Sequence, residues 1–143
     1  MGHVTTKVKV ENMFDLAAHR KGKNGRRGPR ARTVVIPDAL VDTGATHLCL
    51  PGRYIRQLGL PLRRRVRLRT ATGAASFKMY SGALLTIQGR DQECEVVELP
   101  GNAPALVGVI PLEGLDLTVD PLARRVVGKH GRRRFALLYR AKG

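Results

Sequence analysis

Hydrophobic and polar residues alternate with a period of two in several short segments, and no long segment shows the period of a helix. Such alternation places every second side chain on one face of a strand. It predicts strands at residues 6–10, 33–41, 66–70, 76–80, 84–88, 93–99 and 135–139. The second segment is interrupted by Pro37 and Asp38 but is apolar at both ends. The pattern therefore predicts an all-β domain of short strands.

Two segments are exceptions and predict short helices. In residues 51–58, three apolar side chains fall on one side of a helix. This segment begins with Pro51 and is followed by Gly59, which are the start and stop signals expected of a helix. A shorter helix is expected at residues 111–115.

One basic segment lacks any such pattern. Residues 19–32, HRKGKNGRRGPRAR, are rich in Gly and Arg and hold almost nothing that a core could bury. We interpret them as a mobile surface insertion between the first two strands. Two roles stay open for this insertion: a solvated loop, or a contact with nucleic acid or another acidic partner. Residues 1–143 as a whole fit one domain with one core.

The net charge indicates which partners the protein attracts and says little about its fold. Lysine and arginine total 26 against 11 acids, and the resulting charge of +15 attracts acidic partners. Hydrophobic residues make up 43% and charged residues 26%, which is close to the globular average and excludes a disordered chain. With 3 Phe, 3 Tyr and no Trp, few rings exist for base stacking. Binding to nucleic acid is therefore expected to be weak, non-specific and steeply salt-dependent.

The cysteines and the apolar runs predict the compartment. Cys49 and Cys94 are too few for a disulfide framework and lack CxxC spacing, so we expect two buried thiols in a reducing compartment. Neither His47 nor His130 is expected to be functional, and neither a metal nor another cofactor is expected. The N-terminus has no apolar leader, and no apolar run approaches the length of about 18 residues that a membrane helix needs. We expect a cytoplasmic protein that makes no contact with a membrane.

A polar turn follows the second predicted strand. The sequence LVDTGATHLCLP, residues 40–51, places an Asp-Thr-Gly triplet directly after an apolar run. An acid beside a core costs stability unless it is hydrogen-bonded or functional. Residues 66–80 then form a predicted hairpin whose turn, ATGAAS, is small and contains Gly. Later, ALVG at residues 105–108 places two apolar residues before a Gly.

In this order and spacing, the three segments resemble the retroviral-type aspartic peptidases, the retropepsins. The wider frame, with MGHVTTKVKVEN, LGLP and ALVGVIPLEGLDLTVDP, resembles the prokaryotic single-lobe members of that clan more closely. The resemblance covers most of the chain except the basic insertion and the tail after about Gly128. It implies a small closed-barrel-like acid protease lobe that forms a homodimer and hydrolyses a peptide or protein substrate.

The resemblance also implies a role for each residue of the motif. Asp42 from each of two protomers would form a dyad that shares one proton and binds the attacking water. Thr43 would reach across the two-fold axis by its hydroxyl group. Gly44 would allow the turn and present its N–H to the carboxylate, and the backbone of Ala45 would bind an extended substrate.

A flap is implied by the same resemblance. Thr72, Gly73 and Ala74, at the tip of the predicted hairpin, would close over the substrate and exclude water. Residues 106–108 would support the active-site loop from beneath. Since the chain has one DTG triplet and its other acids lie in unlike contexts, the dyad requires two copies of the chain.

Two places depart from the retroviral pattern. The retroviral enzymes usually have an acid soon after DTGA and an Arg after the later Gly, whereas this chain has Thr46-His47 and Val109 there. These differences weaken any inference about the substrate and the interface, but not about the dyad. Residues 5–10 and 135–139 are candidate interface strands, and each also fits an ordinary edge strand.

A second class of function fits the same fold. A catalytically idle relative could serve as a basic module that binds nucleic acid or protein through clusters of arginine. The run at residues 63–65, with Arg67 and Arg69, is expected on the solvated face of a strand. Cleavage of a protein substrate would separate the two functions.

Overall fold

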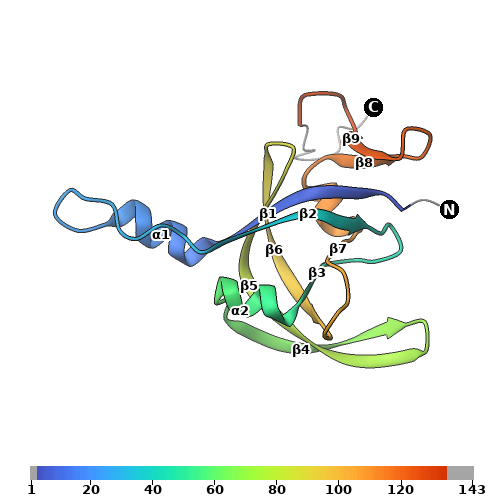
Figure 1. Ribbon diagram of the computed structural model, residues 1–143, viewed down its shortest axis with the longest axis horizontal. Coiled ribbons are helices and arrows are strands. Elements are labelled where there is room, and N and C mark those ends of the chain that lie inside the picture. The colour runs from blue at the N-terminus through green and yellow to red at the C-terminus, as the bar shows by residue number, and fades with distance from the viewer. Residues whose placement is uncertain (1–2, 135–143) are drawn as a thin grey trace, which may run out of the picture.

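The computed structural model describes residues 3–134, so the predicted strand at residues 135–139 lies outside it. Strands hold 51% of the described residues and helices 17%, which confirms the predicted all-β class. A barrel carries a helical arm, a long hairpin and a small two-stranded sheet (Figure 1). The strands are β1 (Thr5–Asn12), β2 (Thr33–Val41), β3 (Leu48–Pro51), β4 (Leu62–Thr70), β5 (Gly73–Ile87), β6 (Arg90–Leu99), β7 (Leu106–Val107), β8 (Leu117–Asp120) and β9 (Arg125–Gly128). The helices are α1 (Met13–Lys21), α2 (Gly52–Leu58) and α3 (Val109–Gly114).

Seven strands form one sheet in the order β1-β2-β7-β3-β6-β5-β4. An additional antiparallel pairing of β1 with β5 closes this sheet into a barrel. β1 is therefore paired with β2 on one side and, over its second half, with β5 on the other. β4 lies outside the closed part, because β5 is its only partner among the described strands. β8 and β9 pair with each other as a separate sheet.

Two bulges shape the long strands. In β2, the register with β1 shifts at Pro37 and Asp38, and a bulge tolerates proline because the regular ladder is already interrupted there. In β5, a second shift at residues 81–82 bends the strand from the hairpin with β4 into the barrel. The separately predicted strands at residues 76–80 and 84–88 are therefore parts of one bulged strand.

The core fills the barrel with every second side chain of its strands. Val8 and Val10 on β1 and Leu85 and Ile87 on β5 are almost completely buried. Burial of an aliphatic side chain of this size stabilises the fold by roughly 1.5–3 kcal/mol. A second, smaller apolar cluster packs beside the β4–β5 hairpin, and its buried members are Cys49, Met79 and Val97.

The predicted helices at residues 51–58 and 111–115 are present as α2 and α3, with ends that shift by one or two residues. β3, β7, β8 and β9 are not among the predicted strands, because each has four residues or fewer, too few to show alternation. All four residues of β3 are buried, as expected for a strand with a neighbour on each side. A turn that begins at Asp120 connects β8 to β9, and Asp91 lies in β6.

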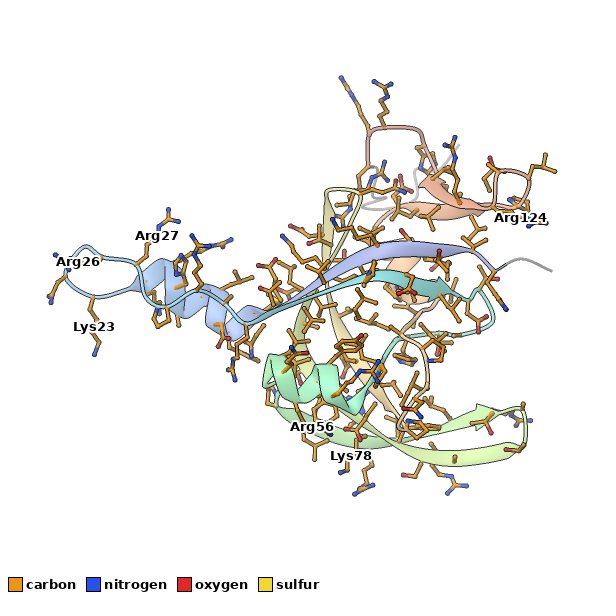
Figure 2. The ribbon with its side chains drawn as sticks, in the orientation of Figure 1. Lys23, Arg26, Arg27, Arg56, Lys78 and Arg124 are labelled. Atoms are coloured by element: carbon orange, nitrogen blue, oxygen red, sulfur yellow. The ribbon has the colours of Figure 1, made fainter. Side chains whose placement is uncertain are left out.

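Residues 13–32 form an arm that projects away from the barrel (Figure 1). No residue of α1 is buried, which explains why hydrophobic periodicity did not predict this helix. The first three residues of the expected surface loop therefore belong to a helix. At the tip of the arm, the side chains of Lys23, Arg26 and Arg27 extend into solvent (Figure 2).

Polar contacts fix the arm at its foot. The side chain of Asn12, itself buried, accepts a hydrogen bond from the Asp15 N–H at 3.0 Å and donates one to the Leu58 carbonyl at 2.8 Å. The guanidinium group of Arg32 donates two hydrogen bonds to Asp15, at 2.7 and 3.0 Å, and lowers the pKa of that carboxyl. The two ends of the arm are thus bonded to each other and to the barrel. None of the helices within residues 3–134 is long and apolar enough to cross a membrane.

Candidate active site

The Asp-Thr-Gly loop leaves the barrel at the end of β2. The N–H of Asp42 donates to the Val107 carbonyl at 3.0 Å, which bonds the aspartate backbone to β7. The N–H of Gly44 donates to Oδ1 of Asp42 at 2.9 Å, the contact that the resemblance implies. The N–H of Ala45 donates to the Asp42 carbonyl at 3.0 Å and closes the turn. Asp42 is therefore oriented by its own loop while it remains exposed.

β7 and the glycine after it support this loop. β7 pairs in parallel with the end of β2 and antiparallel with β3. The N–H of Gly108 donates to the His47 carbonyl at 3.0 Å. A Cβ atom at Gly108 would lie 2.6 Å from the backbone nitrogen of His47, closer than real Cβ contacts allow. Glycine is needed here because two backbone segments pass this close to each other.

The backbone of Ala45 is the predicted contact for an extended substrate. Its N–H is used within the turn, and its carbonyl accepts a hydrogen bond from the Val109 N–H at 2.9 Å. A carbonyl oxygen has two lone pairs, so the carbonyl of Ala45 retains one acceptor position. Only the carbonyl of this residue is therefore available to a peptide in this arrangement.

The tip of the β4–β5 hairpin is held by its own residues. The hydroxyl of Thr70 donates to the Gly73 carbonyl at 2.6 Å and accepts from the Thr72 N–H at 3.3 Å. Gly73 has a φ of 124°, a backbone conformation that residues with a side chain rarely adopt. Thr72, Gly73 and Ala74, the predicted flap residues, are all exposed. A tip with local bonds and little burial can change position at low cost in free energy.

A cavity of about 370 Å³ lies between the loop and the hairpin. Residues 44–47 line it on the side of the loop. The hairpin contributes Leu68, Arg69, Thr70 and Phe77, and the remaining lining comes from Cys49, Val97 and Leu99. Most of these apolar side chains belong to the second apolar cluster. The structure thus brings the DTGA loop and the hairpin to opposite sides of one largely apolar cavity.

The charge of Asp42 affects the pKa of Cys49. Burial raises the pKa of the Cys49 thiol to about 11, and the negative charge of Asp42 adds to the increase. Burial also raises the pKa of Cys94 to about 12, with a further contribution from Glu95. Both cysteines are free, as predicted, although Cys94 is only partly buried.

The aspartates Asp38, Asp116 and Asp120 lie outside the Asp-Thr-Gly triplet, and Asp116 lines a separate cavity together with Thr43. Asp38 is exposed on β2, and Oδ1 of Asp120 accepts from two N–H groups of the β8–β9 turn. Asp116 is buried and lies 2.9 Å from Nδ1 of His130. The residues that line the cavity include no Asp or Glu. Within residues 3–134, no group of three or more His, Cys, Asp or Glu side chains could hold a metal ion.

A comparison with protein families agrees with this geometry. Residues 35–113 match a family described as "gag-polyprotein putative aspartyl protease". The match covers more than half of the chain and runs from β2 through the DTGA loop, the hairpin and β7 into α3. The chain belongs to this family. The resemblance to the retroviral-type aspartyl proteases is thereby confirmed, and a comparison with curated proteins gives no match.

The apolar part of the cavity was not identified from the sequence. Val66 and Leu68 alternate with arginines in the predicted strand, so a signal for an inner face of the hairpin was present. Cys49 gave no such signal because β3 is short and wholly buried. That its side chain borders the cavity follows from the pairing of β3 with β6 and β7, which local sequence does not determine.

Replacing Gly108 with Ala should destabilise the protein, because the new methyl group would collide with the backbone of residues 46–47. We expect the free energy of unfolding to fall by about 1–3 kcal/mol, as for other overpacked sites. Gly52→Ala is the matched control, since its methyl group would meet only the ends of side chains on Arg56 and Glu98. Urea denaturation at one protein concentration measures both. An equal effect of the two substitutions would contradict the assigned role of Gly108.

Replacing Asp42 with Asn should make Cys49 more reactive toward iodoacetamide at pH 9. Removal of the negative charge lowers the pKa of Cys49, and a lower pKa increases the thiolate fraction. We expect an increase of roughly threefold, read by mass spectrometry of the alkylated peptides. Cys94 serves as the internal control because its neighbouring charge is Glu95. Equal acceleration at both cysteines would indicate loosening of the fold and contradict the placement of Asp42.

Proposed function

We propose that the protein is an aspartic endopeptidase whose dyad consists of Asp42 from two protomers. One observation carries the proposal: the loop orients the carboxylate of Asp42 through Gly44 while leaving the residue exposed. The other acids described above have structural partners or lie elsewhere on the surface. A second carboxylate at the loop is therefore best supplied by a second copy of the chain, across a two-fold axis.

The two carboxylates would divide the chemistry between them. Held close together, they share one proton, because two ionised groups at short range repel each other strongly. The ionised Asp42 accepts a proton from the attacking water. The protonated Asp42 polarises the carbonyl of the peptide bond, and a proton then passes to the leaving nitrogen. The amide is thereby hydrolysed to a carboxyl group and an amine.

Thr43 supports the two-fold arrangement by its position. It follows Asp42 in the same loop and is exposed, so its hydroxyl can bond to the loop of a second protomer. Such a bond would fix the distance between the two dyad carboxylates. Because both protomers contribute the same residues, the contact is isologous.

The hairpin tip at Thr72, Gly73 and Ala74 acts in this proposal as a flap. A peptide lies extended between the loop and the hairpin, and its side chains alternate in direction. The cavity of about 370 Å³ accepts an apolar side chain of the substrate. Closure of the tip excludes water from the bond that is hydrolysed, which strengthens the electrostatic interactions of the dyad.

A second candidate function is a basic binding module without catalysis. The arm favours it, since α1 buries no residue and the loop after α1 presents Lys23, Arg26 and Arg27 to solvent (Figure 2). Contact with nucleic acid at the arm would be non-specific and would weaken steeply with salt. The two functions are separated by whether the folded protein cleaves a peptide.

Asp42→Asn should abolish cleavage of a denatured protein between pH 3 and 8, and a statine-type inhibitor should have the same effect on the unchanged protein. The rate of cleavage should fall at least about a thousandfold, because the substitution removes both carboxylates of the dyad, one from each protomer. Asp38→Asn is the matched control, since Asp38 is exposed on the strand that leads to the motif. The rate of cleavage by Asp42→Asn, by Asp38→Asn and by the unchanged protein with inhibitor is measured by mass spectrometry of the fragments over time.

We expect the activity to be highest between acidic and neutral pH, where the pair holds one proton. Cleavage that persists in Asp42→Asn would exclude the proposed dyad. Absence of cleavage by the folded, unchanged protein on a broad set of peptides would favour the binding module.

A further inference from the structure

The outer face of the β4–β5 hairpin carries a one-sided row of arginines. Arg65, Arg67 and Arg69 recur at every second residue of β4, and all three are exposed. Successive members are about 6.6 Å apart because a strand rises about 3.3 Å per residue. We call these three residues the arginine ladder. The expected solvated face of this strand is therefore a continuous basic surface.

No acidic side chain among the described residues pairs with the arginine ladder. Glu95 lies 3.3 Å from Arg63 and 3.5 Å from Arg64, which occupy the base of the hairpin. None of the three ladder guanidinium groups makes an ion pair or a hydrogen bond within residues 3–134. Their positive charge is therefore available to a partner.

Neighbouring strands and helices add to this charge. Lys78 lies directly opposite Arg65 in the register of β4 and β5, and like charges in that position repel each other. Arg56 of α2 and Arg65 lie near Tyr80, whose hydroxyl donates a hydrogen bond to Glu98 at 2.6 Å. Arg56 and Lys78 extend from the same side of the molecule (Figure 2). Glu98 offsets one of these charges, and the remaining excess of positive charge favours binding of an anion.

The ladder lies on a free edge of the sheet. β4 pairs with β5 on one side, and no described strand pairs with its other side. The N–H and C=O groups of such an edge can bond to an added strand. Charged residues on an edge also hinder self-association, and three arginines of one sign would repel a second β4. The same row attracts a strand that carries negative charge.

The ladder also reaches the candidate active site. Arg69, its last member, borders the cavity beside the DTGA loop, together with Leu68 and Thr70. A chain bound along β4 can therefore continue into the cavity.

We propose that the free edge of β4 binds an extended acidic peptide whose carboxylates occupy every second position. Side chains on one face of an added strand repeat with the spacing of the ladder, so each carboxylate can lie opposite one arginine. Arginine suits this task because its planar guanidinium group binds a carboxylate through two hydrogen bonds. This part of the inference rests on the proposed peptidase function: the acidic segment belongs to the protein substrate and lies beside the bond that is cleaved.

A nucleic acid strand fits this surface less well. Opposite Arg67 and Arg69, the register places Ser76 and Ala74, which offer no ring for a base. Tyr80, farther along β5, donates its hydroxyl hydrogen to Glu98 at 2.6 Å and is partly buried. Stacking on aromatic side chains supplies much of the affinity for single-stranded nucleic acid. The unpaired N–H and C=O groups of the β4 edge, by contrast, match the hydrogen-bonding groups of a peptide backbone.

Binding to the Asp42→Asn protein tests the proposal without any need for catalysis. The probes are a fluorescent peptide of alternating Glu and Thr, a block isomer with the same composition, and an oligothymidylate of equal charge. Fluorescence anisotropy should show that the alternating peptide binds at least roughly fivefold more tightly than the block isomer, because only its carboxylates match the ladder. The oligothymidylate should bind less tightly than the alternating peptide.

Two variants with equal changes in charge locate the site. Arg65→Gln with Arg67→Gln and Arg69→Gln should weaken binding of the alternating peptide roughly tenfold or more. Lys23→Gln with Arg26→Gln and Arg27→Gln removes the same charge from the tip of the arm and should change the affinity less than roughly threefold. Circular dichroism and the thermal midpoint verify that both variants are folded.

Equal losses in the two variants, equal affinity for the two peptide isomers, or tighter binding of the oligothymidylate would each overturn the proposal. Failure of the peptidase function gives a different result, in which the peptide binds at the ladder but the unchanged protein cleaves nothing. If the protein is a peptidase, an alternating Glu-Thr segment joined to a cleaved peptide should lower KM, and the ladder variant should remove that gain.

Discussion

The backbone contact between the Asp-Thr-Gly loop and β7 is the constraint on which the candidate site depends. The carbonyl of Val107 accepts a hydrogen bond from the N–H of Asp42. At Gly108 there is no room for a side chain, because the backbone of residues 46–47 passes too close. These contacts join the end of β2 to a segment more than 60 residues later in the chain. With the loop supported from beneath, the bond from Gly44 can orient the carboxylate on the exposed side. The rest of the barrel holds these two segments in register.

The sequence predicted those parts of the fold in which local pattern and tertiary structure agree. Alternation located β2, β4 and β6, and the Pro and Gly signals located α2. It did not locate β3, whose four residues are buried between neighbours, or α1, which buries nothing and is fixed by polar contacts at its foot. Pro37 and Gly82 each accompany a bulge within one strand, so residues that commonly end strands do not end these.

The candidate site was predictable in part for the same reason. The DTG triplet and the Gly after Val107 are local signals that identify the loop and its support. The apolar cavity is not local, since Cys49, Phe77 and Val97 come from three strands that only the sheet order brings together. The charge of the hairpin was visible as a run of arginines, but its meaning depends on β4 being an unpaired edge. Sheet topology thus converts a solvated basic strand into a candidate binding surface.

The central claim is that one active site needs Asp42 from two chains, and a mixing experiment tests it most directly. Unchanged protein and Asp42→Asn are unfolded together in equal amounts, refolded, and assayed for peptide cleavage at constant total protein. If each site takes one Asp42 from each protomer, hybrids are inactive and about one quarter of the activity remains, because subunits pair at random. A remaining activity of about one half would mean that each chain carries a complete site, and would contradict the shared dyad.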